Sequence, residues 1–278
     1  RDAVLLERRE PAEGYLELEL ECPPIARAAG PGQFVMIRAW PGSDPYLPRP
    51  FDILTTDPPR GTLRLFVKVE GRGTALLRGL APGAAVTLTG PLGRAVSLGE
   101  PSALALLVRG AGAAAVVHLA QEATRRGAEV YTILSASTAS RLVCREHLQG
   151  ASRDLLLATD DASAGHGGPA VALLDGLLER RAVQQVYTCG SRRFARHVQE
   201  LDRRGRVRGF VFLEGLMACG LGDCHGCAVP RADGTQWNYI GVYAGGTRKP
   251  VTRALLEAGT WGLELLQKLP GDRNVKLW

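Results

Sequence analysis

Three cysteines stand close together in the last quarter of the sequence. They lie in the run Cys219-Gly-Leu-Gly-Asp-Cys224-His-Gly-Cys227, so their spacing is C-x4-C-x2-C. Plant-type [2Fe-2S] sites use this spacing with a fourth cysteine downstream, because iron in such clusters prefers soft thiolate ligands. The intervening glycines allow the loop to wrap closely and to direct amide hydrogens at the sulfurs. The pattern predicts a [2Fe-2S] cluster with Cys219, Cys224 and Cys227 as ligands.

The fourth ligand of this cluster is not evident from the sequence. No cysteine follows Cys227, and the other three, Cys22, Cys144 and Cys189, lie far upstream. A substitute ligand could come from Asp223, His225, Asp233 or Tyr243, or from a partner protein. Two other interpretations stay open: a zinc knuckle, and a cluster that is labile or lost.

A second group of residues fits a ligand that carries phosphate. In Leu47-Pro-Arg49-Pro50-Phe51-Asp52-Ile53 an arginine follows a proline-stiffened turn, and a guanidinium can pair with pyrophosphate. In Gly71-Arg-Gly73-Thr74 unshielded amides and a hydroxyl stand at the start of a predicted short helix, where anions bind well. Either motif alone is more often an ordinary turn. Their order, followed by Gly90-Pro-Leu-Gly93, makes them specific.

The elements that must position these residues fall into two patterns. The first hundred residues hold short alternating runs, such as 15–20 and 62–69, broken by turn residues, which predicts a small antiparallel barrel or sandwich. From residue 102 a continuous apolar run, 103–108, is followed by Gly110-Ala-Gly112, a helix to about Arg126 and a strand over 129–134. Strand, glycine turn, helix and strand make the unit of a parallel sheet.

Further strands are expected at 154–157 and 183–188, a helix at 169–181, and a closing helix around Leu255, Leu263, Leu265 and Leu266. We therefore expect three regions: a barrel domain over 1–100, an α/β domain over 101–208, and a cysteine-containing region with a tail over 209–278. The boundary between the first two falls near 99–102.

Composition supports this division and excludes several classes of protein. The chain has 278 residues, enough for about two domains, and its apolar and charged shares, 45% and 22%, are ordinary for a globular protein. The net charge of +6 comes largely from arginine, which suits phosphate and carboxylate binding. No run qualifies as a membrane span or a signal peptide, so we expect a reducing, cytoplasmic location, where clustered cysteines favour metal binding. The arginine-rich run 202–208 lacks the interleaved aromatics of a nucleic-acid site and is interpreted as a solvated loop.

Taken together, these motifs resemble those of one family. The chain resembles the electron-transfer subunit of the class B dihydroorotate dehydrogenases, within the ferredoxin-NADP reductase superfamily, from about residue 3 to about 247. The resemblance rests on the motifs at Arg49-Pro50, 71–74 and 90–93, on Tyr187-Thr-Cys189-Gly190, and on the cysteine run from Met217 to Cys227. It implies an FAD-binding barrel, a nucleotide-binding α/β domain and a C-terminal [2Fe-2S] loop. Electrons would pass between the FMN of a catalytic partner subunit and NAD(H), through the cluster and the FAD.

The resemblance also implies roles for particular residues. Arg49 would hold the FAD phosphates, the run Pro50, Phe51, Asp52 and Ile53 would face the flavin ring, and Gly71, Gly73 and Thr74 would form the pyrophosphate loop. Gly110 and Gly112 would belong to the NAD loop. Cys189, at the carboxyl end of a strand where ligands collect in such sheets, is the candidate catalytic residue beside the nicotinamide path.

The sequence departs from the family pattern at several of these positions. Asp52 stands where the family usually has serine or threonine, and Ser191 replaces a proline. The nucleotide loop, usually Gly-Gly-Gly-x-Gly before a proline, reads Gly110-Ala-Gly112-Ala113 here, and the added methyl groups disfavour close approach of a pyrophosphate. Arg109 could offset this by its charge or fill the phosphate position itself. The family's fourth cysteine is missing near Val242–Tyr243.

The sequence thus predicts an electron-transfer subunit that needs a catalytic partner and is inactive alone on dihydroorotate. Two alternatives stay open. One is the reductase subunit of another flavin and iron-sulfur complex, of the hydrogenase or ferredoxin:NADP type. The other is a degenerate structural subunit that has lost its NAD reactivity.

Overall fold

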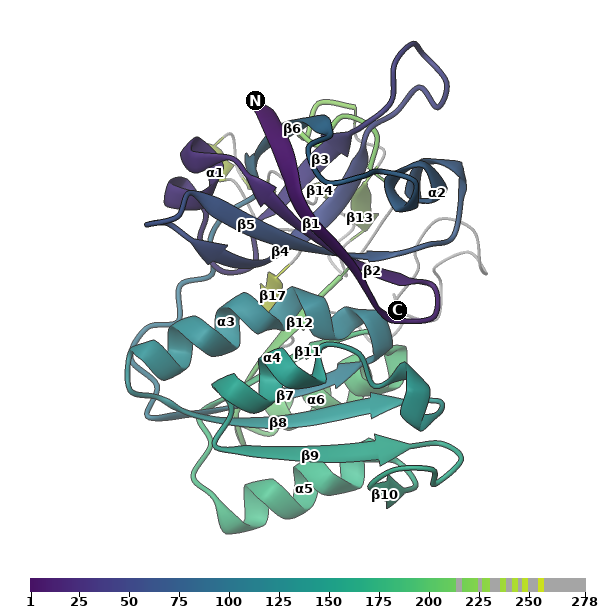
Figure 1. Cartoon of the computed structure of the whole chain (residues 1–278). Helices are drawn as coiled ribbons and strands as arrows, with labels where there is room; N and C mark the ends of the chain where they lie inside the picture. Colours follow the sequence, from purple (N-terminus) through teal and green to yellow (C-terminus); the bar gives the residue numbers. More distant parts are fainter. Residues whose placement is uncertain are drawn as a thin grey trace. The chain divides into compact units, whose positions relative to one another are not determined.

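The computed structural model describes residues 1–213, 217–224 and 227, together with the backbone of five short strands after residue 227. The chain forms two compact units, drawn in Figure 1. Unit 1 is built on Arg1–Val96 and unit 2 on Ser97–Gly215, and segments of the later chain belong to each. The cysteine run falls in unit 1.

Unit 1 is a closed antiparallel barrel with the strand order β1-β2-β5-β4-β3-β6. Its strands are β1 (Asp2–Ala12), β2 (Tyr15–Glu21), β3 (Phe34–Arg38), β4 (Arg49–Asp57), β5 (Thr62–Lys68) and β6 (Ala85–Leu92). Alternation along β2 places Leu16, Leu18 and Leu20 in the barrel core. Two short helices, α1 (Pro23–Ala28) and α2 (Arg72–Arg78), connect the strands. The predicted antiparallel barrel is confirmed.

Two carboxylates of β2 are buried with arginine partners. Glu17 and Glu19 are only 3% and 6% exposed. The Arg64 guanidinium donates to Glu17 at 2.8 Å and to Glu19 at 2.6 Å. Burial alone would lower the pKa of Arg64, but the hydrogen bond to Glu17 and the nearby carboxylate charges raise it above its usual value. This side of the barrel is therefore held together by ion pairs as well as by the backbone ladder.

Unit 2 contains a seven-stranded sheet with the order β10-β9-β8-β7-β11-β12-β17. The strands are β7 (Ala103–Arg109), β8 (Glu129–Ala136), β9 (Asp154–Thr159), β10 (His166–Gly167), β11 (Gln185–Cys189), β12 (Arg208–Phe212) and β17 (Leu255–Glu257). All neighbouring strands are parallel except β12 and β17. The predicted parallel sheet is confirmed.

Helices cover the two faces of this sheet. They are α3 (Ala114–Arg125), α4 (Arg145–Ala151), α5 (Ala170–Arg180) and α6 (Arg192–Arg203), with 3₁₀ turns η1 (Gly110–Ala113) and η2 (Ala139–Arg141). Figure 1 shows α3 and α4 on one face and α5 on the other. The His197 ring of α6 lies 2.7 Å from an Asp175 carboxylate oxygen of α5, which places these two helices side by side.

Two expectations for the last third of the chain are corrected. Leu255, expected in a closing helix, lies in strand β17, because β12 presents an edge with unpaired backbone groups that Leu255–Glu257 satisfies. Residues 263–266 lie outside the described part. The run 202–208 is not entirely a loop, since α6 extends to Arg203 and β12 begins at Arg208. The remaining short strands, β13 (Ala228–Pro230), β14 (Gln236–Asn238), β15 (Val242–Ala244) and β16 (Thr247–Lys249), form a small separate sheet.

None of the helices in the described part of the chain has the length and apolar character that crossing a bilayer requires.

The barrel core provides a first test of the fold. Leu18 is fully buried, so Leu18→Ala should lower the free energy of unfolding by about 2–5 kcal/mol. The matched control is Leu6→Ala on β1, where the leucine is 38% exposed and the change should stay within about 0.5 kcal/mol. Urea denaturation followed by fluorescence measures both values, and equal losses for the two variants would contradict the strand assignment.

Candidate cofactor sites

The structure brings Arg49 and the 71–74 turn together. Arg49 is the first residue of β4, and α2 begins at Arg72 directly after Gly71. A Cβ atom at Gly73 would lie 2.6 Å from Arg49 Nε, so the guanidinium rests against the glycine backbone. Only a residue without a side chain permits this approach. Unit 1 thus places a cationic guanidinium beside a turn whose backbone no side chain covers. A pyrophosphate can be bound by such a pair of groups.

Thr74 holds the shape of this turn. Its hydroxyl accepts hydrogen bonds from the Glu70 and Gly71 amides, both at 3.0 Å, and donates to the Gly71 carbonyl at 2.9 Å. The side chain is therefore engaged with the backbone of its own turn. Its contribution is to fix the backbone that Arg49 contacts.

Sequence reasoning missed Trp40, which organises the loop before β4. The Arg38 and Arg49 guanidiniums lie 5.9 and 5.7 Å from its ring centroid, close enough for cation–π attraction. The indole nitrogen donates to the Pro45 carbonyl at 2.6 Å. Arg72 pairs with Asp44 of the same loop at 2.8 Å. The available signal was a tryptophan two residues after an arginine, but nothing in this spacing marked it as part of a site.

The run Pro50–Ile53 alternates between the two sides of the barrel wall. Phe51 and Ile53 pack with the core. Since side chains alternate along a strand, Pro50 and Asp52 belong to the outer face, opposite Met36 and Phe34 in the ladder. Of the four side chains that the resemblance assigns to the flavin ring, these two are placed to meet a ligand on the outside of the barrel.

The cysteine loop surrounds the Cys219 sulfur with hydrogen-bond donors. Burial alone would raise the pKa of this thiol, but the Cys224, Leu221 and Asp223 amides and the Cys224 thiol outweigh it and lower the pKa to about 7. The Leu221 amide donates to the sulfur at 3.3 Å. Gly220 and Gly222, at φ of +71° and +89°, supply the left-handed backbone that turns these amides inward. The loop is built to stabilise a thiolate, as an iron-sulfur ligand requires.

The same loop packs tightly on the barrel. A Cβ atom at Gly220 would lie 2.6 Å from Met36 Cγ and 3.1 Å from Leu92 Cδ1. Met36 lies in β3 and Leu92 in β6, and Leu92 belongs to the 90–93 motif. That motif therefore helps to seat the cysteine loop on the face of the barrel that carries Pro50 and Asp52.

The three predicted cluster ligands are differently placed. Cys219 and Cys224 are in contact, with Cys224 exposed, whereas Cys227 is buried. Within the described residues, no three cysteine, histidine or carboxylate side chains converge on a metal position. Of the four candidates for the missing ligand, only Asp223 has a described side chain, which is exposed. His225, Asp233 and the Tyr243 side chain lie outside the described residues.

In unit 2 the glycine loop lies where the order of the strands reverses. From β7 the chain continues to β8 and β9 on one side and later to β11 and β12 on the other, and ligands of such sheets bind at this switch point. A Cβ atom at Gly112 would lie 2.8 Å from Gly190 Cα, so the loop packs directly against the end of β11. Ala113 is fully buried, so its added methyl group points into the protein. Of the two added methyl groups, only that of half-buried Ala111 is placed to hinder a ligand.

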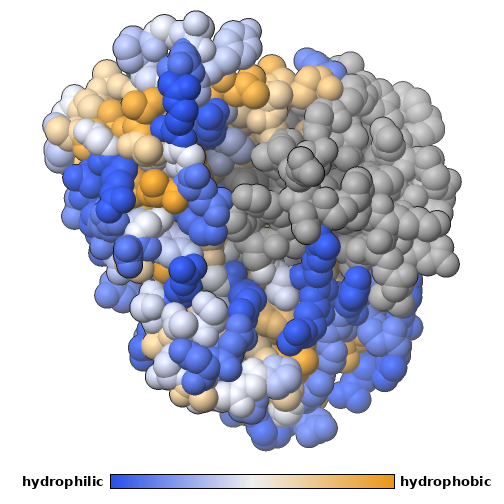
Figure 2. All heavy atoms as spheres, turned by 90° about the vertical axis from the view of Figure 1, so that its right-hand side faces the viewer, coloured by the Kyte–Doolittle hydropathy of each residue, from blue (hydrophilic) through white to orange (hydrophobic). Residues whose placement is uncertain are grey.

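Arg109 and Cys189 flank this loop. The Arg109 guanidinium donates to Ser135 Oγ at 2.9 Å and to the Asp160 carboxylate at 3.1 Å, so its charge is already paired. Cys189 ends β11, is 3% exposed, and lies beside Gly112. Hydrophilic side chains predominate on the face of unit 2 that Figure 2 shows.

His118 of α3 is half-buried. Burial lowers its pKa to about 4, against the opposing charge of Glu122. The ring is therefore neutral at physiological pH. Its Nδ1 atom is buried without a hydrogen-bond partner among the described residues.

Comparisons with known proteins agree with this geometry. The family profile described as "Oxidoreductase FAD-binding domain" matches residues 15–96. The dihydroorotate dehydrogenase B (NAD(+)) electron transfer subunit of Desulforamulus reducens is 35% identical over 82% of this chain and 87% of its own. The same subunit of Geobacillus thermodenitrificans is 32% identical over 90% of this chain and 95% of its own. A solved NADH-dependent reduced ferredoxin-NADP oxidoreductase, studied for flavin-based electron bifurcation, superimposes with a TM-score of 0.80 at 25% identity, over 97% of this chain and 93% of that one.

A closed antiparallel barrel followed by a parallel α/β unit is the architecture of the ferredoxin reductase type of flavoprotein. The sequence identity of 35% and 32% to the two electron transfer subunits, over 87% and 95% of their length, identifies the family within this class. The chain belongs to the family of dihydroorotate dehydrogenase B electron transfer subunits, as its motifs predicted.

The environment of Cys219 yields a test on protein prepared without iron. The rate of Cys219 alkylation should rise with pH through a midpoint near pH 7. This is well below the usual thiol pKa of about 8.5, because amide donors stabilise the thiolate. Leu221→Pro removes one donor and should move the midpoint upward, whereas Leu221→Ala keeps the amide and should not. Mass spectrometry of the Cys219 peptide measures the rate. A midpoint above 8 in the parent protein would contradict the described loop.

Proposed function

We propose that the chain binds FAD on unit 1 and a [2Fe-2S] cluster on Cys219, Cys224 and Cys227, and passes electrons between a catalytic dehydrogenase subunit that carries FMN and NAD(H). The reaction served is dihydroorotate oxidation in pyrimidine biosynthesis. The observation that carries the proposal is that Arg49, Gly73 and the cysteine loop all belong to one folded unit. Membership in the family supports it independently.

For FAD, the chain offers a cationic side chain and a rigid backbone turn. The Arg49 guanidinium would pair with the pyrophosphate beside Gly73, while Thr74 keeps the turn in place. Pro50 and Asp52 would lie against the ring on the outer barrel face. When bound, FAD exchanges electron pairs with a nicotinamide and single electrons with an iron-sulfur cluster. The side chains of unit 1 hold and orient it.

For the cluster, the donor set fits the chemistry of iron. Three thiols within one loop, one of them with a depressed pKa, match the preference of iron-sulfur clusters for thiolates. The fourth ligand would come from a residue outside the described part or from the partner. Because clustered thiols stay reduced in a reducing compartment, we also propose a cytoplasmic location.

For NAD(H), the proposed site is the switch point of unit 2. Gly110 and Gly112 open the turn at the end of β7, and Arg109 stays paired with Asp160 rather than occupying the phosphate position. Cys189 would lie beside the nicotinamide, behind Gly112. Of the two alanine side chains at 111 and 113, only the half-buried one of Ala111 would lie against the bound NAD(H).

A second candidate function is a reductase subunit of the ferredoxin:NADP type. The observation in its favour is the TM-score of 0.80 to the NADH-dependent reduced ferredoxin-NADP oxidoreductase over nearly the whole chain. The two candidates differ in the partner that exchanges electrons with the cluster.

The contact between Gly73 and Arg49 gives a test of the FAD site. Gly73→Ala would push the guanidinium away, and losing a charge-assisted hydrogen bond of about 1.5–3 kcal/mol should weaken FAD binding about tenfold or more. Gly150→Ala adds the same methyl group in open space on α4 of unit 2, away from the proposed FAD site, and should leave binding unchanged. Titration of FAD into flavin-stripped protein measures both. Equal affinities for the two variants would exclude the proposed pyrophosphate position.

Activity separates the two candidate partners. The chain alone should not oxidise dihydroorotate. With the catalytic subunit encoded by the same organism, it should couple dihydroorotate oxidation to NAD⁺ reduction, and Cys219→Ser should reduce that coupled rate at least tenfold. NADH formation at 340 nm measures the rate. Reduction of NADP⁺ by reduced ferredoxin, without any response to dihydroorotate, would favour the ferredoxin-type candidate instead.

A further inference from the structure

Trp40 lies in the loop between β3 and β4, and two arginines share its ring. The tryptophan is only 7% exposed. The Arg38 and Arg49 guanidiniums lie over this ring, at 5.9 and 5.7 Å from its centroid. Two like charges beside one ring repel each other, so this arrangement needs groups that compensate for the repulsion.

The compensating groups are neutral. Arg38 donates a hydrogen bond to the Tyr46 carbonyl at 2.8 Å, and Arg49 donates to the Leu47 carbonyl. Among the described residues, no carboxylate forms an ion pair with either arginine. The indole ring adds the attraction of its electron-rich face for cations. Because carbonyls and an indole carry no net charge, the site keeps both positive charges, which match the charge of a pyrophosphate diester.

The Arg49 guanidinium is held from several sides. It contacts the Trp40 ring and the Leu47 carbonyl, and its Nε would lie 2.6 Å from a Cβ atom at Gly73. Trp40 is itself fixed, since its indole nitrogen donates to the Pro45 carbonyl at 2.6 Å. A guanidinium that already occupies its binding position loses less conformational freedom when an anion binds. The ring therefore pre-organises the arginine on the glycine turn.

We propose that Trp40 is a positioning residue of the FAD site. Its ring holds the Arg49 guanidinium beside Gly73 and so strengthens the binding of the FAD pyrophosphate, while Arg38 adds a second positive charge. The inference rests on the proposed FAD site and extends it to a side chain that acts on the cofactor through Arg49.

Titration of FAD into the flavin-stripped full chain tests whether Trp40 acts through Arg49. Trp40→Leu should weaken FAD binding about threefold to tenfold because the cation–π contact is lost, whereas Trp40→Phe keeps an aromatic face and should retain most of the affinity. Arg49→Gln should weaken binding about tenfold or more. Adding Trp40→Leu to Arg49→Gln should then cause no further loss, because the two residues act as a unit. Equal losses from Trp40→Leu in both backgrounds, or no loss in either, would overturn the inference.

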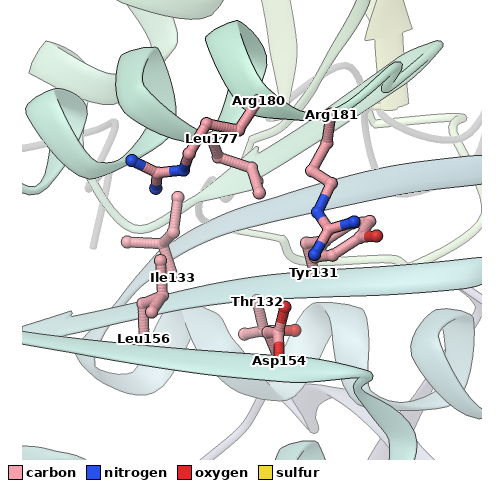
Figure 3. Close-up of a pocket in the computed structure, with 8 residues that line it drawn as sticks. All are labelled: Tyr131, Thr132, Ile133, Asp154, Leu156, Leu177, Arg180 and Arg181. Atoms are coloured by element: carbon pink, nitrogen blue, oxygen red, sulfur yellow. The ribbon is translucent and has the colours of Figure 1, made fainter.

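A similar pair of side chains in unit 2 provides the matched control. Figure 3 shows the Arg181 guanidinium beside the Tyr131 ring, 5.8 Å from its centroid. Tyr131 is also buried, with 1% exposure. Tyr131→Leu removes a buried ring and its contact with an arginine in the other unit, so it should leave FAD binding unchanged. A loss as large as that of Trp40→Leu would show that the effect is not specific to Arg49 and would overturn the inference.

Tetrafluorotryptophan incorporated at position 40 alone keeps the test decisive if Trp40→Leu does not fold. Fluorine withdraws electron density from the ring face, while the ring shape and the indole N–H remain. FAD binding should weaken about threefold or more, because the weakened face attracts a cation less. Unchanged affinity would overturn the role of the ring and leave the FAD site standing. A parent chain that binds no FAD would instead overturn the proposed FAD site, and this inference with it.

Discussion

The contact of Gly220 with Met36 and Leu92 is the constraint on which the proposed electron path depends. Because Gly220 lacks a side chain, the cysteine loop can lie directly on β3 and β6 of the barrel. The same barrel carries Arg49 and Gly73, and its outer face bears Pro50 and Asp52. The two proposed redox cofactors therefore belong to one folded unit, so their separation is set by the barrel and not by the linkage between the two units.

The barrel can serve as a rigid support because its interior and its outer charges are both satisfied. Its core is a continuous set of leucine, isoleucine and valine side chains contributed by every strand. Outside, the buried carboxylates of β2 are neutralised by Arg64 at hydrogen-bond distance. Breaking such a buried pair leaves an uncompensated charge and costs about 3–5 kcal/mol, so these residues stabilise the barrel as it is. In unit 2 the close backbone contact between Gly112 and Gly190 holds the ends of β7 and β11 together, and these two strands border the switch point.

Much of the architecture could be predicted because local patterns determined it. The alternation of residues 15–20 reflects a strand with one face in the apolar core and one polar face, and the apolar run 103–108 reflects a strand with apolar residues on both faces. The motifs at Arg49 and at 71–74 could be recognised by residue type, and the structure places them in contact. The role of Trp40 could not be predicted, because it arises from contacts with Arg38 and Arg49 that depend on the fold. Strand β17 was also not predicted. A leucine-rich segment alone does not show that it will pair with the free edge of β12 rather than form a helix.

We propose that unit 1 holds both a flavin and an iron-sulfur cluster, and that the cysteine loop packs on the barrel through Gly220. The most direct measurement is the flavin, iron and sulfide content of anaerobically purified chain, with EPR after reduction, for the parent protein and for Gly220→Val. We expect one flavin per chain, the two irons and two sulfides of a [2Fe-2S] cluster, and a reduced-cluster EPR signal. Gly220→Val should keep its flavin and lose the iron and the signal, because the added side chain would overlap Met36. A parent protein that binds flavin but contains no iron would show that unit 1 does not hold the cluster.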